Sequence, residues 1–348
     1  MSRIALKIGT RGSDLALAQT RWVISRLQAS NPRVTAVPVV ISTAGDRMRD
    51  TASLRAAGTG VFVKELEKAL KARRIDAAVH SLKDMPTELP DGLEIAAILE
   101  REEPADAFVG RGTVPIEQLP RGSVVGTSSL RRQALLQAAY PHIRVQDLRG
   151  NLDTRLEKLR DPKSTLAGIV VAAAGLRRLR GPDGVHHQTL PKDRVVPAAG
   201  QGALAVEIRS KDVKTKALFA PLHDEKAAAE TTAERELVRR LEGGCLAPLG
   251  AWAQASEDGL LRLMSAIARP DGSELIRADA TGLVESPIEV AAALETILRS
   301  RGAEEILASL QPRRLKPARN GHSKKSSKLR ASSFKRKKTS AAKAKSRR

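Results

Sequence analysis

The sequence predicts an α/β protein with two similar lobes, followed by a smaller α+β domain. Three observations predict this fold: buried strands alternate with amphipathic helices, the alternation repeats after a Pro-containing joint, and the pattern changes beyond Asp224. At 348 residues the chain can form two or three domains of ordinary size. Its 41% hydrophobic and 28% charged residues are typical of globular domains rather than of disordered or fibrous chains.

The first lobe begins with an apolar strand at residues 4–8. A glycine-containing loop follows at 9–13, and apolar residues then recur at helical spacing to residue 27. The same order continues through a strand at 34–41, a helix at 61–71, and strands at 75–79 and 94–99. Such alternation predicts a largely parallel sheet.

The second lobe follows a polar joint at residues 101–104, which we interpret as a hinge. Its expected elements are strands at 107–109, 123–125, 143–146 and 167–172, and helices at 130–139, from 153, and at 175–179. The segment 195–208 reads as a strand that returns the chain to the first lobe. Two crossings between two α/β lobes predict a pair of periplasmic-binding-protein-like lobes around a cleft.

The third domain has a different pattern. A helix is expected from Asp224 to about 242, then a Gly-Gly turn, a hairpin around 270–272, and helices at 288–298 and 304–310. The predicted boundaries are 1–102 with 199–219 for domain 1, 106–196 for domain 2, 223–311 for domain 3, and 312–348 for a disordered basic tail.

The tail holds most of the excess positive charge. Sixteen Lys and Arg and no acidic residue lie between Pro312 and Arg348, so the rest of the chain carries only +5 of the formal +21. A segment of this composition cannot form a packed core. It is expected to attract nucleic acid or an anionic surface, and a solubilising extension without a partner is an equally good interpretation.

Several classes of protein are disfavoured by the composition. The N-terminus lacks the features of a signal peptide, and no stretch approaches the roughly 20 apolar residues of a membrane span, so we expect a cytoplasmic protein. One cysteine excludes an intramolecular disulfide and a Cys-rich zinc site, and His186-His187 shows no metal-ligand spacing, so no metal is expected. The 2% aromatic content argues against a base-stacking surface.

Arginines gather at loops and helix starts of the second lobe. Residues 121–180 hold twelve Lys and Arg against four Asp and Glu. Arg131 and Arg132 follow the loop 126–129, and Arg149 and Arg155 flank a second strand-to-helix connection, where free backbone N–H groups favour anions. Because a guanidinium pairs well with carboxylate or phosphate, the cleft is predicted to bind a polyanion. Solvated helix faces with surface ion pairs are the alternative interpretation.

Two further residues are candidates for chemistry. Asp84 lies just beyond a buried strand, where open α/β sheets bind ligands, and a carboxylate there can stabilise a developing cation or transfer a proton. An Asp before a Pro turn is also a common structural residue. Cys245 follows two glycines at a helix exit, so its thiol is either a reactive group or buried filler.

The sequence resembles the hydroxymethylbilane synthase (porphobilinogen deaminase) family from about residue 4 to 310. The matching stretches occur in the family's order: Gly9-Thr10-Arg11 with Ser13, Gly45-Asp46, Phe62 to Glu67, Val79 to Pro86, Glu100 to Glu102 with Asp106 to Val109, Gly126 to Gln133, Leu148 to Asn151 with Thr154 to Leu156, Ala174 to Leu176, Pro197 to Ala203, and Leu241 to Cys245.

The resemblance implies a three-domain monomer that assembles hydroxymethylbilane for tetrapyrrole biosynthesis. Four porphobilinogens are added head to tail on a dipyrromethane cofactor joined to Cys245 by a thioether, and hydrolysis releases the product. Asp84 is the implied catalytic residue, which stabilises the cationic azafulvene formed when ammonia leaves. The other implied cofactor-binding residues are Lys83, Ser81, Thr127, Ser128, Ser129, Arg131, Arg132, Arg155 and Gly202. The implied substrate-binding residues are Arg11, Ser13, Arg149, Asn151, Arg178 and Gln201.

The chain departs from the family pattern at two places. Thr59 stands where the family usually has lysine in a flexible segment, 46–60, with Arg55 as the candidate substitute. The tail is an addition that the family's core does not require. A solute-binding protein is the runner-up function and a nucleic-acid-binding protein the third, but neither explains Asp84 together with Cys245.

Overall fold

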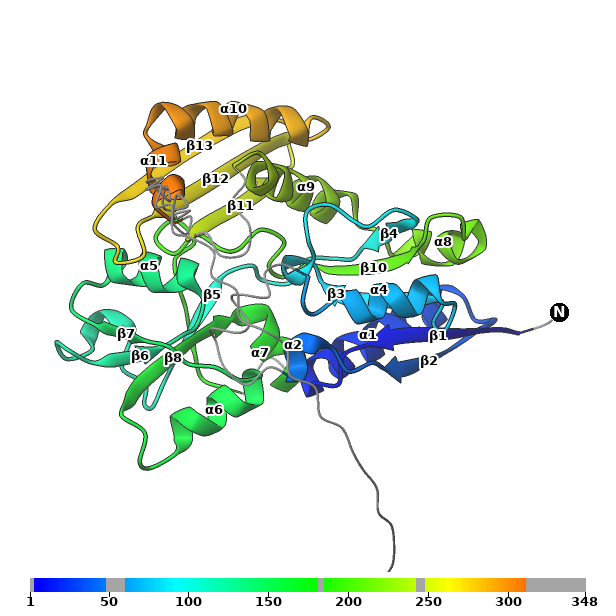
Figure 1. The fold of residues 1–348 in the computed structure, drawn as a ribbon, viewed down its shortest axis with the longest axis horizontal. Coiled ribbons are helices and arrows are strands. Elements are labelled where there is room, and N and C mark those ends of the chain that lie inside the picture. The colour runs from blue at the N-terminus through cyan, green and yellow to red at the C-terminus, as the bar shows by residue number, and fades with distance from the viewer. Residues whose placement is uncertain (1–2, 48–59, 181–184, 242–247, 311–348) are drawn as a thin grey trace, which may run out of the picture. The chain divides into compact units, whose positions relative to one another are not determined.

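Three β-sheets, each with its own helices, build the chain (Figure 1). The structure is a computed structural model, and it describes residues 3–47, 60–180, 185–241 and 248–310. Strands from both ends of the first 210 residues form the first sheet, the second sheet is made entirely from the stretch between them, and the third follows in sequence.

The first sheet has the strand order β2-β1-β3-β10-β4. Its elements are β1 (Ile4–Thr10), α1 (Asp14–Ser30), β2 (Val34–Val40), α2 (Ala44–Arg47), α4 (Lys64–Lys71), β3 (Ala77–Ser81), the 3-10 turn η1 (Leu82–Asp84), β4 (Leu93–Ile98), β10 (Leu204–Arg209), α8 (Val213–Phe219) and η3 (Ala220–Leu222). Strands β2, β1 and β3 are parallel, whereas β10 runs antiparallel to β3 and β4. The expected return of the chain is therefore correct, but the sheet is mixed, because β10 enters from the opposite lobe.

The second sheet has the order β7-β6-β8-β5-β9. Its elements are β5 (Asp106–Gly110), η2 (Ile116–Gln118), β6 (Val124–Gly126), α5 (Leu130–Ala139), β7 (Arg144–Gln146), α6 (Leu152–Arg160), β8 (Leu166–Ala172), α7 (Ala173–Arg180) and β9 (Gln188–Thr189). Strands β7, β6 and β8 are parallel, and β5 is antiparallel to β8 because it carries the chain in from the first lobe. Both lobes thus have the same mixed design, with a crossing strand beside a parallel set.

The third sheet is an antiparallel meander, β11-β12-β13. Its elements are α9 (Glu225–Arg240), β11 (Leu249–Ala255), β12 (Leu260–Ala268), β13 (Leu275–Leu283), α10 (Pro287–Ser300) and α11 (Ala303–Leu310). Apolar residues of α9, α10 and α11 pack with those of the sheet into one core that includes Leu237, Leu263, Leu294 and Ile306. The hairpin and helices agree with the sequence analysis, but β11 was not foreseen because its alternating Ala and Gly residues give a weak strand signal.

The segment 195–208 is a strand only in its second half. Residues 199–202 instead form turns, in which Gly200 and Gly202 have φ of +73° and +92°. Such angles are open to glycine at no steric cost. The glycines therefore end the extended conformation that the neighbouring apolar residues suggest, and β10 begins at Leu204.

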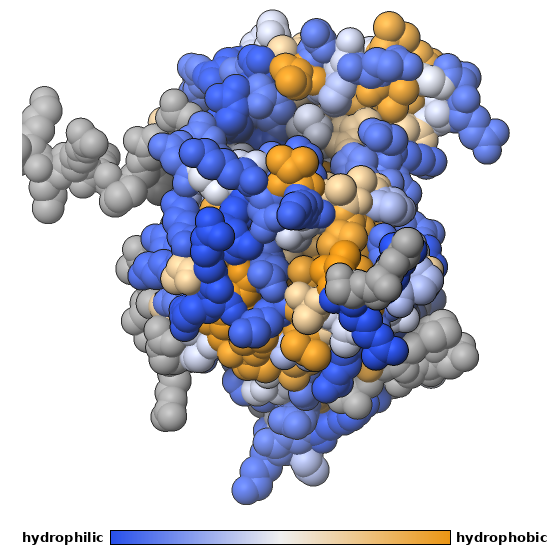
Figure 2. Space-filling view, turned by 90° about the vertical axis from the view of Figure 1, so that its right-hand side faces the viewer, coloured by the Kyte–Doolittle hydropathy of each residue, from blue (hydrophilic) through white to orange (hydrophobic). Residues whose placement is uncertain are grey.

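The surface mixes hydrophilic and apolar residues on the face shown in Figure 2. Exposed apolar side chains of the first lobe include Ile4, Val37 and Val40, which lie on the neighbouring strands β1 and β2. Among the described helices, none combines the length and apolarity needed to cross a membrane.

Candidate active site

A cavity of about 250 Å³ lies where the first two sheets face each other. The first lobe contributes residues after β1, the start of α1, and the turn after β3. The second lobe contributes the starts of α6 and α7. Gly202 and Ala203 of the returning segment complete the lining. Of the sequence-predicted site residues, the cavity brings together Arg11, Ser13, Ser81, Lys83, Asp84, Arg132, Asn151, Arg155, Arg178 and Gly202.

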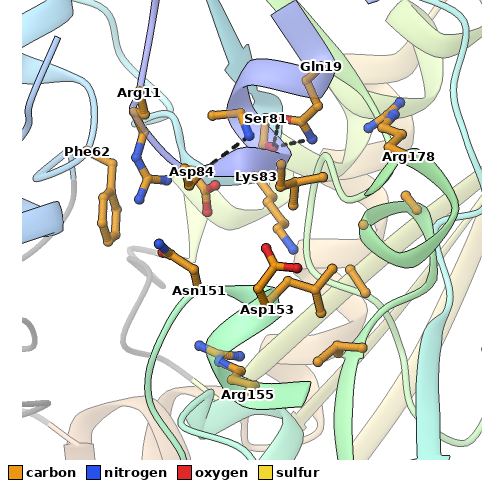
Figure 3. A pocket seen from close by; sticks show the side chains of 18 of the residues that line it. Arg11, Gln19, Phe62, Ser81, Lys83, Asp84, Asn151, Asp153, Arg155 and Arg178 are labelled. Atoms are coloured by element: carbon orange, nitrogen blue, oxygen red, sulfur yellow. Dashed lines mark hydrogen bonds between the residues drawn. The ribbon is translucent and has the colours of Figure 1, made fainter. Parts of the chain in front are cut away.

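Lys83 and Asp84 occupy the turn η1, directly after the carboxyl end of β3. Figure 3 shows both side chains on the wall opposite Asn151, Asp153 and Arg155. A buried strand and the apolar Leu82, which is fully buried, fix the start of this turn. The predicted catalytic aspartate therefore reaches a cavity at the position where open α/β sheets bind ligands.

Three helices begin at the cavity wall. Ser13 is the N-cap of α1, and its Oγ accepts from the backbone N–H of Ala16 at 3.3 Å. Asn151 precedes α6, and Ala174 and Gly175 lie in the first turn of α7. Helix starts carry partial positive charge and free N–H groups, so these three helices favour anions in the cavity.

Basic side chains outnumber acids in the cavity. Among the described residues, the basic lining residues are Arg11, Lys83, Arg132, Arg155 and Arg178, and the acidic ones are Asp84 and Asp153. Two of the five cations form ion pairs with acids that are not part of the lining: Arg11 with Asp46 and Arg132 with Asp106.

The other three basic groups donate to neutral oxygens in the described part of the chain. Lys83 Nζ donates to Gln201 Oε1 at 3.3 Å. Arg155 Nε donates to the Gly150 carbonyl at 2.8 Å, and Arg178 Nη2 donates to the Gly202 carbonyl at 2.7 Å. These contacts orient the charged groups without neutralising them.

Burial lowers the pKa of all three of these groups. Desolvation is the main cause for Lys83, whose pKa falls to about 8 although the neighbouring Asp84 raises it. Burial lowers the pKa of Arg155 and of Arg178 to about 10. A buried charge that is left uncompensated disfavours its own charged state, so an anionic ligand would stabilise all three.

Arg11 is held at one side of the cavity by two contacts. Its guanidinium pairs with Asp46 at 2.5 Å and lies 4.1 Å from the centre of the Phe62 ring. Burial alone would raise the pKa of Asp46. The pKa is nevertheless lowered, because Arg11 and Thr43 donate to the Asp46 carboxylate. A ligand carboxylate that binds Arg11 must therefore share it with Asp46.

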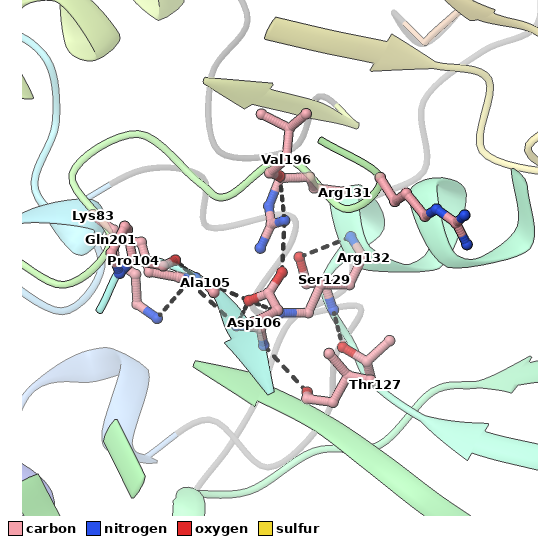
Figure 4. Close-up of polar contacts among 12 residues, drawn as sticks. Lys83, Pro104, Ala105, Asp106, Thr127, Ser129, Arg131, Arg132, Val196 and Gln201 are labelled. Atoms are coloured by element: carbon pink, nitrogen blue, oxygen red, sulfur yellow. Dashed lines mark hydrogen bonds and ion pairs between the residues drawn. The ribbon is translucent and has the colours of Figure 1, made fainter. Parts of the chain in front are cut away.

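Asp106 organises the two predicted arginines of α5 (Figure 4). Arg131 Nη1 lies 2.8 Å from one carboxylate oxygen of Asp106, and Arg132 Nη2 lies 2.7 Å from the other. Burial alone would raise the pKa of Asp106, but the two guanidinium groups lower it far below its usual range. Arg131 also donates to the Val196 carbonyl at 2.6 Å and so stabilises the junction of the two lobes. Arg132, by contrast, lines the cavity.

Gln201 links this network to the turn η1. Its Nε2 donates to Asp106 at 2.9 Å and to the Pro104 carbonyl at 2.6 Å, and its Oε1 accepts from Lys83 and Arg132, each at 3.3 Å. The neighbouring Gly202 cannot be replaced without strain, because a Cβ there would lie 2.2 Å from the Glu102 carbonyl oxygen. The returning segment thus contacts the other crossing between the lobes, at residues 102–104.

Some predicted site residues are not part of the cavity lining. They are Thr127, Ser128, Ser129, Arg131, Arg149 and Gln201. Ser129 is the N-cap of α5 and accepts from the Arg132 backbone N–H at 3.4 Å. Ser128 Oγ donates to the Leu148 carbonyl at 2.7 Å. In this structure both serines shape the loops that present the arginines.

Cys245 lies outside the described residues, as do Arg55, Thr59 and the tail 312–348. Their predicted roles therefore remain predictions. Conversely, Asp106, Gln19 and Phe62 were assigned no site role from the sequence. Gln19 Nε2 donates to Ser81 Oγ at 3.2 Å, and Gln19 lies four residues after Leu15 and three after Ala16, the spacing of one helix face, so all three line the cavity.

The fold and the cavity define a two-lobed α/β protein with a cationic cleft suited to a ligand that carries several carboxylates. Within the described residues no cluster of metal-ligating side chains is found. The chain belongs to the porphobilinogen deaminase family. Residues 6–217 match the family profile described as porphobilinogen deaminase, dipyromethane cofactor binding domain, and residues 228–299 match the porphobilinogen deaminase C-terminal domain.

Curated relatives match this chain over most of their own length. A porphobilinogen deaminase of Desulforudis audaxviator is 45% identical over 87% of this chain and 97% of its own. The porphobilinogen deaminase of Ralstonia nicotianae is 44% identical over 88% of this chain and 91% of its own. Among solved structures, the methionine binding protein MetQ superimposes with a TM-score of 0.38 and 14% identity, over 66% of this chain and 93% of that chain.

Proposed function

We propose that this protein is a hydroxymethylbilane synthase, a transferase of tetrapyrrole biosynthesis. It joins four porphobilinogen molecules head to tail with loss of ammonia and then releases hydroxymethylbilane by hydrolysis. The observation that carries this proposal is the cavity that places Asp84 among five basic side chains in a chain of this family. Each pyrrole of the substrate brings two carboxylates, which explains why one cavity contains several basic groups that donate to neutral oxygens.

The cavity residues fit the dipyrromethane cofactor. Lys83, Arg132 and Arg155 would hold its acidic side chains, because their charges are buried and their pKa shifts favour an anion beside Lys83 and Arg155. We infer that Cys245 carries the cofactor through a thioether, since a thiolate is the best nucleophile the chain offers. When bound, the cofactor supplies the pyrrole carbon to which the first substrate is joined.

The other basic residues would hold the substrate. Arg11 and Arg178 line the cavity from the two lobes and are suited to its acetate and propionate groups, with Ser13 and Asn151 at the helix starts as further donors. Arg149 and Gln201 are not part of the lining and would act on the substrate only after the cleft changes shape.

Asp84 would act while the substrate's carbon–nitrogen bond breaks. Ammonia departs with the bonding electron pair, so positive charge develops on the remaining pyrrole. A fixed carboxylate beside that charge stabilises the transition state more than the ground state. The new carbon–carbon bond then forms and a proton leaves the attacking pyrrole carbon.

The direct test is the intact mass of the purified protein together with its turnover of porphobilinogen. We expect a mass that exceeds the unmodified chain by one dipyrromethane, and formation of hydroxymethylbilane. A protein that binds porphobilinogen but leaves it unchanged would instead support the solute-binding alternative.

Lys83 predicts how carboxylate binding by the cofactor-free cavity depends on pH. Because a carboxylate binds the protonated amine, affinity should be constant below about pH 8 and fall above it, where the free protein has lost the proton. With other groups unchanged, a pKa of about 8 implies that the Kd of the cofactor-free Cys245→Ser chain for a polycarboxylate rises roughly tenfold from pH 7 to pH 9.

Lys83→Arg is the control for this prediction, since a guanidinium stays charged throughout the range. Introduced into the Cys245→Ser chain, it should remove most of the rise in Kd. An unchanged pH dependence in Lys83→Arg would show that another group controls binding.

We further propose that the tail 312–348 binds nucleic acid through its charge. Sixteen basic residues with no acid favour counterion release from a polyanion, and Leu315, Leu329 and Phe334 are too few large apolar residues for membrane insertion. Deleting 312–348 should abolish retention on duplex DNA at low salt while changing kcat by less than about twofold, because the cavity residues precede the tail.

Two outcomes would contradict that proposal. A truncated chain that stays on DNA would place the polyanion surface elsewhere, and a folded truncation without turnover would make the tail part of the catalytic machinery. If the full chain bound anionic vesicles but not DNA, the membrane alternative would replace it. The domain boundaries, the monomeric state and the cytoplasmic location stay predictions from the sequence.

A further inference from the structure

Helix α9 of the third sheet contacts the turn that carries Lys83 and Asp84. Arg235 of this helix donates to carbonyl oxygens of the residues that form and follow the turn. Its Nη1 lies 3.4 Å from Leu82 O and 3.3 Å from Met85 O. Its Nη2 lies 2.6 Å from Pro86 O and 3.3 Å from Thr87 O.

These contacts suit a guanidinium. Its donors are fixed in one plane, so two nitrogens can hold four carbonyl oxygens in a defined arrangement. Three of the acceptors, Met85, Pro86 and Thr87, lie in a segment without regular secondary structure, since η1 ends at Asp84 and β4 begins only at Leu93. The fourth, the Leu82 carbonyl, belongs to η1 and also accepts from the Met85 N–H at 3.2 Å. Arg235 therefore links helix α9 of the third domain to the turn that carries Lys83 and Asp84, called the catalytic turn below.

The same helix is fixed to the returning segment by the residue before Arg235. Glu234 accepts from the Gly200 backbone N–H at 2.7 Å and from the Ala253 backbone N–H at 2.8 Å. It also pairs with the buried Arg101 of the hinge at 2.8 Å. Helix α9 thus contacts its own sheet, both hinge crossings and the catalytic turn.

Gly200 in turn lies directly against the catalytic turn. A Cβ at position 200 would be 3.0 Å from Leu82 Cγ and 3.2 Å from the Lys83 backbone nitrogen. The turn is consequently held from two directions: Gly200 packs against its beginning and Arg235 binds the carbonyls around its end.

Helix α9 also leads to the predicted cofactor attachment site. The helix ends at Arg240 with Leu241 as its C-cap, four residues before Cys245. Four residues reach at most about 14 Å. Arg235 therefore links the turn that carries Lys83 and Asp84 to the helix that precedes Cys245 in the sequence.

We propose that Arg235 is a positioning residue for catalysis: by binding the carbonyls of residues 82–87 it fixes Lys83 and Asp84 relative to the helix that precedes Cys245. The proposal rests on the function proposed above. Arg235 does not line the cavity itself, so it acts through the turn rather than on the substrate.

The test is Arg235→Lys in the full-length holoenzyme. A single ammonium cannot reproduce the four contacts, so the turn should shift or loosen. Because misplacing a catalytic group by about 1 Å can cost up to a hundredfold, we expect kcat to fall about 10- to 100-fold, with KM within about threefold. Arg235→Gln provides a second variant if the lysine variant does not fold.

Arg239→Lys is the matched control. Arg239 lies one turn further along α9, is exposed, and pairs with Glu236 at 2.8 Å. The same substitution there should leave kcat, KM and the melting temperature nearly unchanged.

A double-mutant cycle separates positioning from a loss of stability. If Arg235 acts by placing Asp84, Arg235→Lys should reduce the single-turnover rate much less in the Asp84→Asn background than in the wild type. Amide hydrogen exchange at residues 82–88 should accelerate in Arg235→Lys and not in Arg239→Lys.

Normal kcat in a folded Arg235→Lys enzyme, or rate losses that simply multiply with those of Asp84→Asn, would overturn the proposal. Unchanged exchange at residues 82–88 would overturn it as well. This last measurement needs no turnover, so it remains decisive if the wild-type chain proves inactive toward porphobilinogen, a result that would refute the proposed function.

Discussion

A Cys245→Ser chain should fold, lack the dipyrromethane adduct and show no turnover of porphobilinogen. The serine hydroxyl stays protonated at neutral pH and is a far weaker nucleophile than a thiolate, so the thioether cannot be replaced by an equivalent bond. Because Cys245 is the only cysteine, no second thiol can substitute for it. Intact mass spectrometry should find the unmodified chain, and the assay should find no hydroxymethylbilane above background, because the first substrate has no cofactor carbon to join.

The cationic cavity provides the control for folding in this variant. Its basic residues all precede Cys245 in the sequence and come from the first two lobes, so a folded Cys245→Ser chain should still bind a polycarboxylate. Persistence of the pyrrole adduct in the serine variant would show that the cofactor is attached elsewhere.

Much of the fold could be predicted because its signals are local. The apolar strand 4–8, the loop at Gly9 and the helix after Ser13 follow from residue periodicity and an N-cap, and the structure has β1 and α1 there. Asp84 could be placed by the same reasoning, since the end of a buried strand marks the ligand-binding edge of the sheet.

Contacts between distant residues could not be predicted in this way. Arg131 and Arg132 are adjacent in sequence and both suggest an anion site, but Asp106, 25 residues before Arg131, binds both. Nothing in the local pattern indicates that one arginine supports the lobe junction and the other borders the cavity. The same holds for Arg235, whose carbonyl acceptors begin 153 residues away at Leu82.

Local signals also conflict with each other at the returning segment. Apolar residues from Val195 suggest a strand, whereas the glycines at 200 and 202 permit the positive φ angles that end it. The glycine positions prevail because side chains there would collide with the turn at Leu82 and with the Glu102 carbonyl, and neither collision is visible without tertiary structure.

Asp84→Asn should lower kcat at least about a hundredfold while KM changes little. The amide keeps the size of the carboxylate but lacks its charge, so it cannot stabilise the positive charge that develops as ammonia leaves. The basic residues that hold the substrate's carboxylates are separate side chains, and the substitution leaves them in place.

Asp91→Asn is the matched control, because Asp91 is exposed in the same lobe and lies outside the cavity lining. Its kcat should equal that of the wild type. The decisive measurement is the single-turnover rate of porphobilinogen condensation, which reports the chemical step without product release. If Asp84→Asn condensed substrate nearly as fast as Asp91→Asn, the negative charge at the end of β3 would have no catalytic role. Asp84 would then be a structural residue of the turn, and the positive charge would have to be stabilised by Asp153, the other carboxylate of the cavity lining.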